Sequence, residues 1–250
     1  MEVKKREVLF SVIIALFLFC LGVFISGKIS ENAVRTAEKY TTATPIDDTD
    51  KFLYGMNTGF GNALVYGEVT TNEPVTFEEI GNGYIYIQKI KEEYRMHERE
   101  VTHTDSNGKE YTTTEYYWTW DYMRSDSRNA KTITFLGVEF PYNTFDTPGY
   151  RLNLSDAGVS NRGNYIYTSS DVRYYYNVTP LSITGTVFAE LRDGTMKNTS
   201  YLYQDQTPDQ VIARKQNMEK GSLIIFWILW SLLMGGAVFG FLYLENRWLD

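Results

Sequence analysis

Residues 223–244 read LIIFWILWSLLMGGAVFGFLYL and contain no charged side chain. As an α-helix this stretch would rise about 33 Å at ~1.5 Å per residue, which is enough to cross a hydrocarbon core of roughly 30 Å. A second apolar stretch, VLFSVIIALFLFCLGVFIS at residues 8–26, lies near the other end of the chain. Everything between the two is polar, tyrosine-rich and strand-like. The sequence therefore predicts a mainly β domain flanked by two transmembrane helices.

The first apolar stretch is predicted to be an uncleaved anchor. It is longer than the ~7–15-residue apolar core of a signal peptide, and no A-x-A-like cleavage site follows it. Cys20 is preceded by the bulky Phe19, which fits a lipoprotein cleavage site poorly.

The orientation in the membrane follows from the basic flanks. Lys4, Lys5 and Arg6 form a tight cluster before the first stretch, whereas the basic residues that follow it are dispersed. Because positive flanks tend to stay inside, we expect both termini in the cytoplasm and residues 28–221 outside it or in a lumen. Cys20 is the only cysteine, so the middle domain has no disulfide, which is ordinary for a bacterial surface domain. The plasma membrane of a bacterium is the favoured location.

Charge and motifs argue against several function classes. The net charge is −7 and falls on the middle domain, which disfavours nucleic acid as a partner. His97 and His103 would lie ~20 Å apart in a strand, too far to share one metal ion. No G-x-S-x-G motif and no phosphate-binding glycine loop is present, so we expect no enzyme activity, cofactor, metal or small-molecule substrate.

The predicted domain organisation has six parts. They are an N-terminal anchor (1–27), a helical stalk and linker (28–50), the β-rich domain (51–206), a helix leading to the membrane (207–221), the C-terminal transmembrane helix (222–245) and a short tail (246–250). Thr207 is expected to cap the helix that starts at Pro208, with Gln210 completing a capping box. Gly221 is the expected joint between this helix and the membrane span.

The β-rich domain is predicted to contain about seven or eight strands, arranged as a sandwich or in a barrel-like form. Single strands are expected at residues 62–69, 81–90, 132–140, 165–178 and 181–191, the last of these followed by a turn at Asp193-Gly194. A long hairpin is expected over residues 93–105 and 109–123, joined by a type I′ turn at Asn107-Gly108.

Aromatic side chains suggest an interaction surface. The chain has 20 tyrosines, 14 phenylalanines and 5 tryptophans. In two runs the aromatics would occupy both faces of a strand, one packed in the core and the other offered to a partner or to lipid headgroups. The alternative is that both faces are buried. The candidate residues are Tyr116, Trp118, Trp120, Tyr174 and Tyr176.

Small residues suggest where the membrane helices pack. Gly236 and Gly240 form a small-x-x-x-small pair next to Gly235, and such pairs allow close helix approach. The partner is expected to be the first span, through Gly22 and Ser26, or another subunit.

Several segments resemble the transmembrane protein 43 (LUMA) family and, more distantly, the membrane-flanked domain of mitochondrial E3 ubiquitin ligases of the GIDE type. They are ALVYGEV, EEYRMHE, YYWTWD, SDVRYYYNV, ITGTVFAELRDGT and TPDQVIARKQNMEKGSLIIFWILWSLLM. The resemblance implies a β-rich domain between membrane helices that acts as a scaffold. The family ends in several consecutive spans where this chain has one, and no RING follows, so ligase activity is not carried over.

The function predicted from these features is a non-enzymatic membrane scaffold or assembly subunit that binds other membrane proteins. The alternative is an accessory or oligomeric subunit of a transport, secretion or channel complex. The spans carry no charged residue, which speaks against an ion-conducting wall built by them alone. A surface enzyme with a dispersed site is the least favoured reading.

Overall fold

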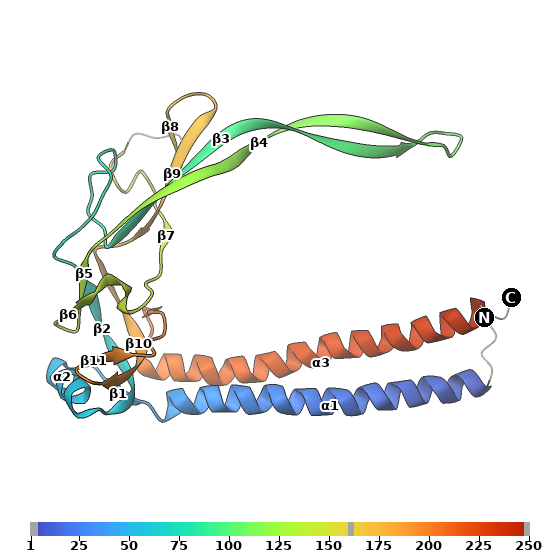
Figure 1. Cartoon of the computed structure of the whole chain (residues 1–250), viewed down its shortest axis with the longest axis horizontal. Coiled ribbons are helices and arrows are strands. Elements are labelled where there is room, and N and C mark those ends of the chain that lie inside the picture. The colour runs from blue at the N-terminus through green and yellow to red at the C-terminus, as the bar shows by residue number, and fades with distance from the viewer. Residues whose placement is uncertain (1–4, 160–162, 248–250) are drawn as a thin grey trace.

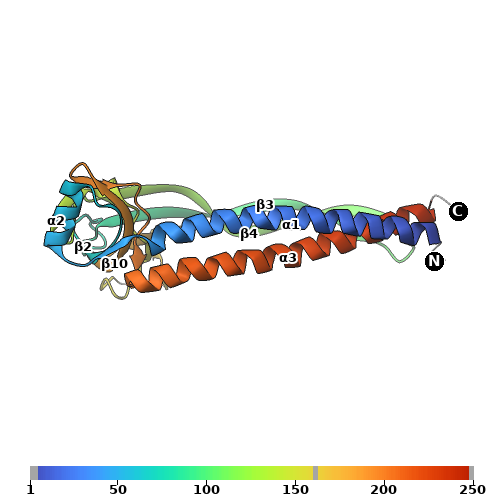
Figure 2. The same ribbon diagram turned by 90° about the horizontal axis from the view of Figure 1, so that it is seen from below.

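The computed structural model describes residues 5–159 and 163–247. Two long helices, α1 (Lys5–Thr41) and α3 (Pro208–Arg247), lie side by side and leave a β-rich body in the same direction (Figures 1 and 2). Both are long and apolar enough to cross a membrane. The predicted fold class, a mainly β domain flanked by two such helices, is confirmed. Lys4 and the last three residues of the predicted tail lie outside the described residues.

The first sheet forms the part of the body nearest the helices (Figure 1). Its strand order is β11 (Thr195–Lys197), β10 (Ser182–Arg192), β2 (Gly61–Thr70), β5 (Thr132–Phe135) and β6 (Val138–Pro141), with β1 (Thr44–Ile46) parallel to β2 and β12 (Tyr203–Gln204) on β10. The central pair, β2 and β10, is buried on both faces: Val65 and Val187 face one core, while Leu64 and Phe188 face another. This explains why both strands are continuous apolar runs rather than alternating ones.

The second sheet carries the long hairpin. Its strand order is β4 (Glu110–Asn129), β3 (Tyr86–Thr104), β9 (Val172–Thr179) and β7 (Tyr150–Arg151), with β8 (Ile166–Tyr167) also paired to β9. One face of the sheet is covered by a separate core that includes Phe77, Ile87, Leu154 and Val178.

Three expected single strands have different limits. Residues 132–140 form a two-stranded hairpin, β5–β6, because Leu136 and Gly137 both have positive φ and turn the chain. Residues 165–178 also fold back, as β8 on β9. The strand expected at 81–90 is the first part of β3, so the hairpin is longer than predicted.

The two predicted turns differ in type. Asp193 and Gly194 both have positive φ, as a type I′ turn requires. At the hairpin tip only Gly108 does, with a φ of 79°, so the expected type I′ turn is wrong there. The Asp105 side chain accepts from the backbone N–H of Asn107 and Lys109, at 2.8 and 2.9 Å, and these bonds stabilise a three-residue loop instead.

The predicted linker is structured. It contains β1 and the start of α2 (Thr49–Thr58), an unpredicted helix. Asp48 caps α2 by accepting from the backbone N–H of Lys51 at 2.9 Å, and Gly59 ends it in the left-handed region. The expected joint at Gly221 is wrong, since α3 runs through it unbroken.

Both helices are attached firmly to the body. Tyr40 at the end of α1 and Val211 at the start of α3 pack on Leu64 and Phe188. The hydroxyl groups of Tyr40 and Tyr203 hydrogen-bond at 3.1 Å in this buried cluster. The backbone N–H of Thr207 donates to Gln210 Oε1 at 2.9 Å, which confirms the predicted capping box.

Candidate interaction surface on the long hairpin

The distal part of the β3–β4 hairpin extends beyond the rest of its sheet (Figure 1). The pairing of β3 with β9 ends at Glu93, and the backbone N–H of Tyr94 makes one more bond, to the Asp171 carbonyl at 2.8 Å. From there to the tip, β3 and β4 pair only with each other among the described strands. We call residues 94–120 the free hairpin. Beyond Tyr94 both its strand edges are unpaired among the described residues, and an isolated two-stranded ribbon is marginally stable at best in water.

One face of the free hairpin is aromatic. The register places Tyr94 opposite Trp120, Met96 opposite Trp118 and Glu98 opposite Tyr116, so these side chains share a face. The Tyr94 ring lies 5.4 Å from the Trp118 ring and 5.2 Å from the Trp120 ring. Tyr116 is 62% exposed and Trp118 is 55% exposed. We call Tyr94, Met96, Tyr116, Trp118 and Trp120 the aromatic face.

The other face of the free hairpin is polar. Arg99 pairs with Glu115 across the strands at 2.9 Å. His97 stacks on the Tyr117 ring and hydrogen-bonds to Asp121 at 2.6 Å. His103 lies farther out along the same face. The described residues hold no cluster of metal-binding side chains.

An arginine anchors the base of the aromatic face. The Arg173 guanidinium lies 4.0 Å from the Trp120 ring centre and 3.8 Å from that of Tyr165, and it donates to Glu92 at 2.6 Å. Burial alone would lower the pKa of Arg173, but hydrogen bonds to Tyr167 and Glu92 outweigh it and raise the pKa. Arg173 therefore stays charged and holds the Trp120 ring in place.

Tyr176 does not belong to a partner surface. It is 1% exposed, and its hydroxyl donates to Glu79 at 2.7 Å. Burial, followed by this hydrogen bond, raises the pKa of Tyr176 well above its ordinary value. The expectation for Tyr176 fails because alternate β9 side chains face the second core. Tyr174 is half-buried and lies on the same side of the sheet as Tyr176, not on the aromatic face.

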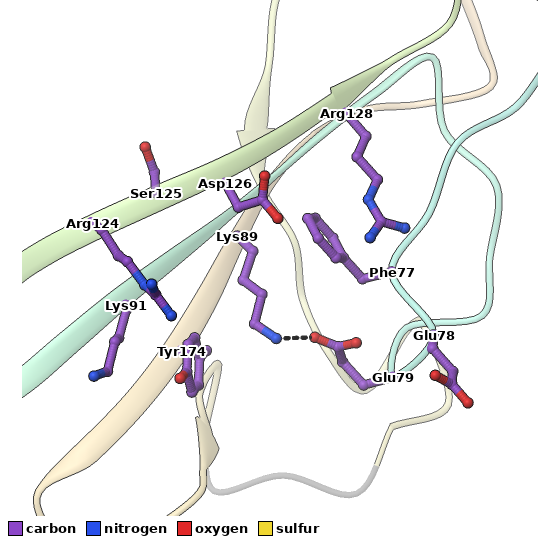
Figure 3. Close-up of a pocket in the computed structure, with 10 residues that line it drawn as sticks. All are labelled: Phe77, Glu78, Glu79, Lys89, Lys91, Arg124, Ser125, Asp126, Arg128 and Tyr174. Carbon is purple, nitrogen blue, oxygen red and sulfur yellow. Dashed lines mark hydrogen bonds and ion pairs between the residues drawn. The ribbon is translucent and has the colours of Figure 1, made fainter.

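Tyr174 lines a groove of about 650 Å³ at the base of the hairpin (Figure 3). The charged residues around it are Glu78, Glu79, Lys89, Lys91, Arg124, Asp126 and Arg128. Two of the four cations already bind carboxylates: Lys89 pairs with Glu79, and Lys91 pairs with Glu93 at 2.6 Å. The groove is thus a mixed-charge surface.

The helices α1 and α3 meet at one of the predicted glycines. The Trp230 indole N–H donates to the Leu18 carbonyl at 3.0 Å, and a Cβ placed on Gly22 would lie 2.3 Å from Trp230 Nε1. Gly22 therefore makes room for the indole ring. Trp230 was not foreseen, because an indole in an apolar run gives no signal of which helix it faces.

The other candidate packing residues make no such contact. The Ser26 hydroxyl donates to the Val23 carbonyl of its own helix at 3.0 Å. A Cβ on Gly235, Gly236 or Gly240 would have nothing within 4 Å among the described residues. Among the described residues, that side of α3 is open.

The residues predicted from the sequence include Tyr116, Trp118 and Trp120 of the aromatic face but not Tyr94, Met96 or the neighbouring Arg173. The first two can be found by counting back from the hairpin turn, since the turn determines which residues are opposite each other. Arg173 comes from β9, and nothing local in the sequence links it to Trp120.

No family model, curated protein or solved structure matches this chain. The resemblance to the transmembrane protein 43 family stays a prediction.

Proposed function

We propose that this protein is a non-enzymatic membrane scaffold that uses the β3–β4 hairpin to bind other membrane proteins. The helices α1 and α3 anchor it, with both termini in the cytoplasm and the β-rich body outside it or in a lumen. The bacterial plasma membrane is the proposed location.

The free hairpin is the observation that carries this proposal. It exposes two unpaired strand edges and large aromatic side chains far from the body's own cores. Unpaired edges accept strands from a partner, and the exposed Tyr111 and Tyr117 on the polar face supply contact area at little entropic cost. The anchoring cluster around Tyr40 and Tyr203 then sets the distance between this binding element and the membrane.

The test is purification of the full chain from native membrane in mild detergent, followed by identification of the proteins that come with it. In a matched variant, Asn-Gly replaces residues 99–115, so that Glu98 and Tyr116 flank a short turn. The scaffold proposal expects a defined foreign subunit with the native chain and its loss with the shortened hairpin. Tyr54→Ser, which removes an exposed aromatic from α2, is the control and should retain the partner. Equal recovery with the shortened hairpin would contradict the role of the hairpin.

The proposed orientation is tested at the hairpin tip. In a Cys20→Ser background, Ser106→Cys should react with a membrane-impermeant maleimide on intact cells. Reaction only after lysis would place the body in the cytoplasm.

The second candidate function is an oligomeric subunit of a transport, secretion or channel complex. The open side of α3 around Gly236 and Gly240 favours it, because small residues let another helix approach closely. A ring made of this polypeptide alone, seen after chemical crosslinking in membranes, would favour this function over the scaffold.

A further inference from the structure

The free hairpin points toward the membrane. In both views it runs in the same direction as α1 and α3, away from the body and toward the end where the chain termini lie (Figures 1 and 2). If the helices cross a bilayer, as the proposed function requires, the hairpin approaches the same bilayer from the side of the body.

The hairpin is too long to stop short of that bilayer. Between the apolar run that ends at Ser26 and the end of α1 at Thr41, the helix spans only about 22 Å at ~1.5 Å per residue. From Glu93, where the support of β9 ends, to Asn107 at the tip, an extended strand spans about 46 Å at ~3.3 Å per residue. The proximal part of the free hairpin, which bears the aromatic face, therefore comes level with the lipid headgroups.

The distal part cannot continue into the hydrocarbon. It carries, among others, Glu100, Asp105, Lys109 and Glu110, and each charge at a bilayer centre costs at least about 2.5 kcal/mol. The hairpin must therefore turn aside beyond the aromatic face, where among the described strands β3 and β4 pair only with each other.

We propose that the aromatic face of the free hairpin rests on the lipid headgroups beside the two membrane helices. Tryptophan and tyrosine prefer this zone, where the ring is in an apolar layer and the N–H or O–H stays hydrated. The free hairpin has 3 Lys and Arg against 5 Asp and Glu, a net charge of −2, so anionic lipid does not attract it. The partner is a zwitterionic lipid surface. The strand edges and the polar face stay available to the protein partners of the proposed function, on which this inference rests.

Spin labels in the full chain test the contact, in vesicles of phosphatidylcholine. Tyr116 and Tyr117 are neighbours at the same height on opposite faces, both exposed, and so form a matched pair. Each is changed to cysteine in a Cys20→Ser background and labelled with a nitroxide. The native Cys20, exposed on the first span, is labelled separately as the reference for insertion. Collision of each label with oxygen, which concentrates in lipid, is compared with collision with a water-soluble nickel chelate.

The expected result is a several-fold lower ratio of nickel to oxygen collisions at Tyr116→Cys than at Tyr117→Cys, unchanged by added salt. Equal, high nickel collision at both positions, with Cys20 protected, would overturn the headgroup contact and leave the membrane anchor intact. Nickel access to Cys20 would instead contradict the membrane function itself. A third outcome is that the label at Tyr116→Cys is protected from both oxygen and the nickel chelate and that dipolar coupling between nitroxides broadens its spectrum. This outcome would assign the aromatic face to a second copy of the chain and would also overturn the proposal.

Discussion

Trp230 lies directly over Gly22, so the helices α1 and α3 approach each other at a point where one has no side chain. A Cβ on Gly22 would lie 2.3 Å from Trp230 Nε1, closer than atoms tolerate. The same indole donates to the Leu18 carbonyl at 3.0 Å. This contact fixes the rotation and height of α1 against α3.

Gly22→Leu should separate the helices. Overpacking of this kind costs about 1–3 kcal/mol. The readout is disulfide formation between Phe10→Cys and Phe241→Cys in a Cys20→Ser background, since these rings lie 6.4 Å apart. The rate should fall in the Gly22→Leu variant. Gly236→Leu is the control, because a Cβ there meets nothing, and its rate should stay unchanged. A similar fall in both variants would contradict the contact.

The buried hydrogen bond between Tyr40 and Tyr203 should couple α1 to the first sheet. Each single change to phenylalanine is expected to destabilise the protein by about 0.5–1.5 kcal/mol, the net value of a hydrogen bond. The double variant should cost less than the sum, since the second change removes a bond already lost. Thermal unfolding of the full chain in detergent, followed by circular dichroism, measures the cycle. Additive effects would mean that the two hydroxyls do not depend on each other.

Glu79 should make stability depend on pH on the acid side. Burial alone would raise its pKa, but hydrogen bonds from Lys89 and Tyr176 outweigh burial and lower the pKa. A carboxylate with a lowered folded-state pKa stabilises the protein above its unfolded pKa of about 4.3, and the effect is lost as the pH falls through the folded pKa. Glu79→Gln should therefore flatten the dependence of the unfolding midpoint on pH between neutral and acid. The neighbouring Glu78→Gln should leave it steep, and equal flattening would refute the assignment.

Tyr176→Phe should destabilise the second core. The change removes the donor to Glu79, and hydrogen bonds to charged groups contribute about 1.5–3 kcal/mol. The unfolding midpoint in detergent is the measurement. Tyr175→Phe is the matched control, because Tyr175 is only half-buried and lies on the opposite face of β9. A midpoint unchanged by Tyr176→Phe would show that the bond contributes little.

The local sequence correctly predicted the cap and the turn whose conformation depends on residues close together in the chain. The capping box at Thr207 and Gln210 formed as expected, because its bonds join residues within one helical turn. The turn at Asp193-Gly194 did so for the same reason. The helix α2 was missed although Asp48 is a good N-cap, because residues 28–50 were assigned to a stalk and linker and residues 51–206 to a β-rich domain.

The predictions were wrong where a run of residues folds back into two strands and where one face of a strand is buried. The runs at 132–140 and 165–178 look continuous, yet each folds back into a pair of antiparallel strands. Tyr174, Tyr175 and Tyr176 are adjacent and chemically identical, so only the position of the second core decides that Tyr176 is inside.

The sequence by itself determined that two helices with long uncharged apolar stretches flank a β-rich middle, because length and hydropathy are local properties of the chain. It also determined that the hairpin turns near Asn107, since turn residues act over a few positions. Tertiary structure alone decided that Trp230 meets Gly22, that Arg173 holds Trp120, and that the hairpin runs in the same direction as α1 and α3. These relationships join residues far apart in the chain, and they follow from which surfaces pack together.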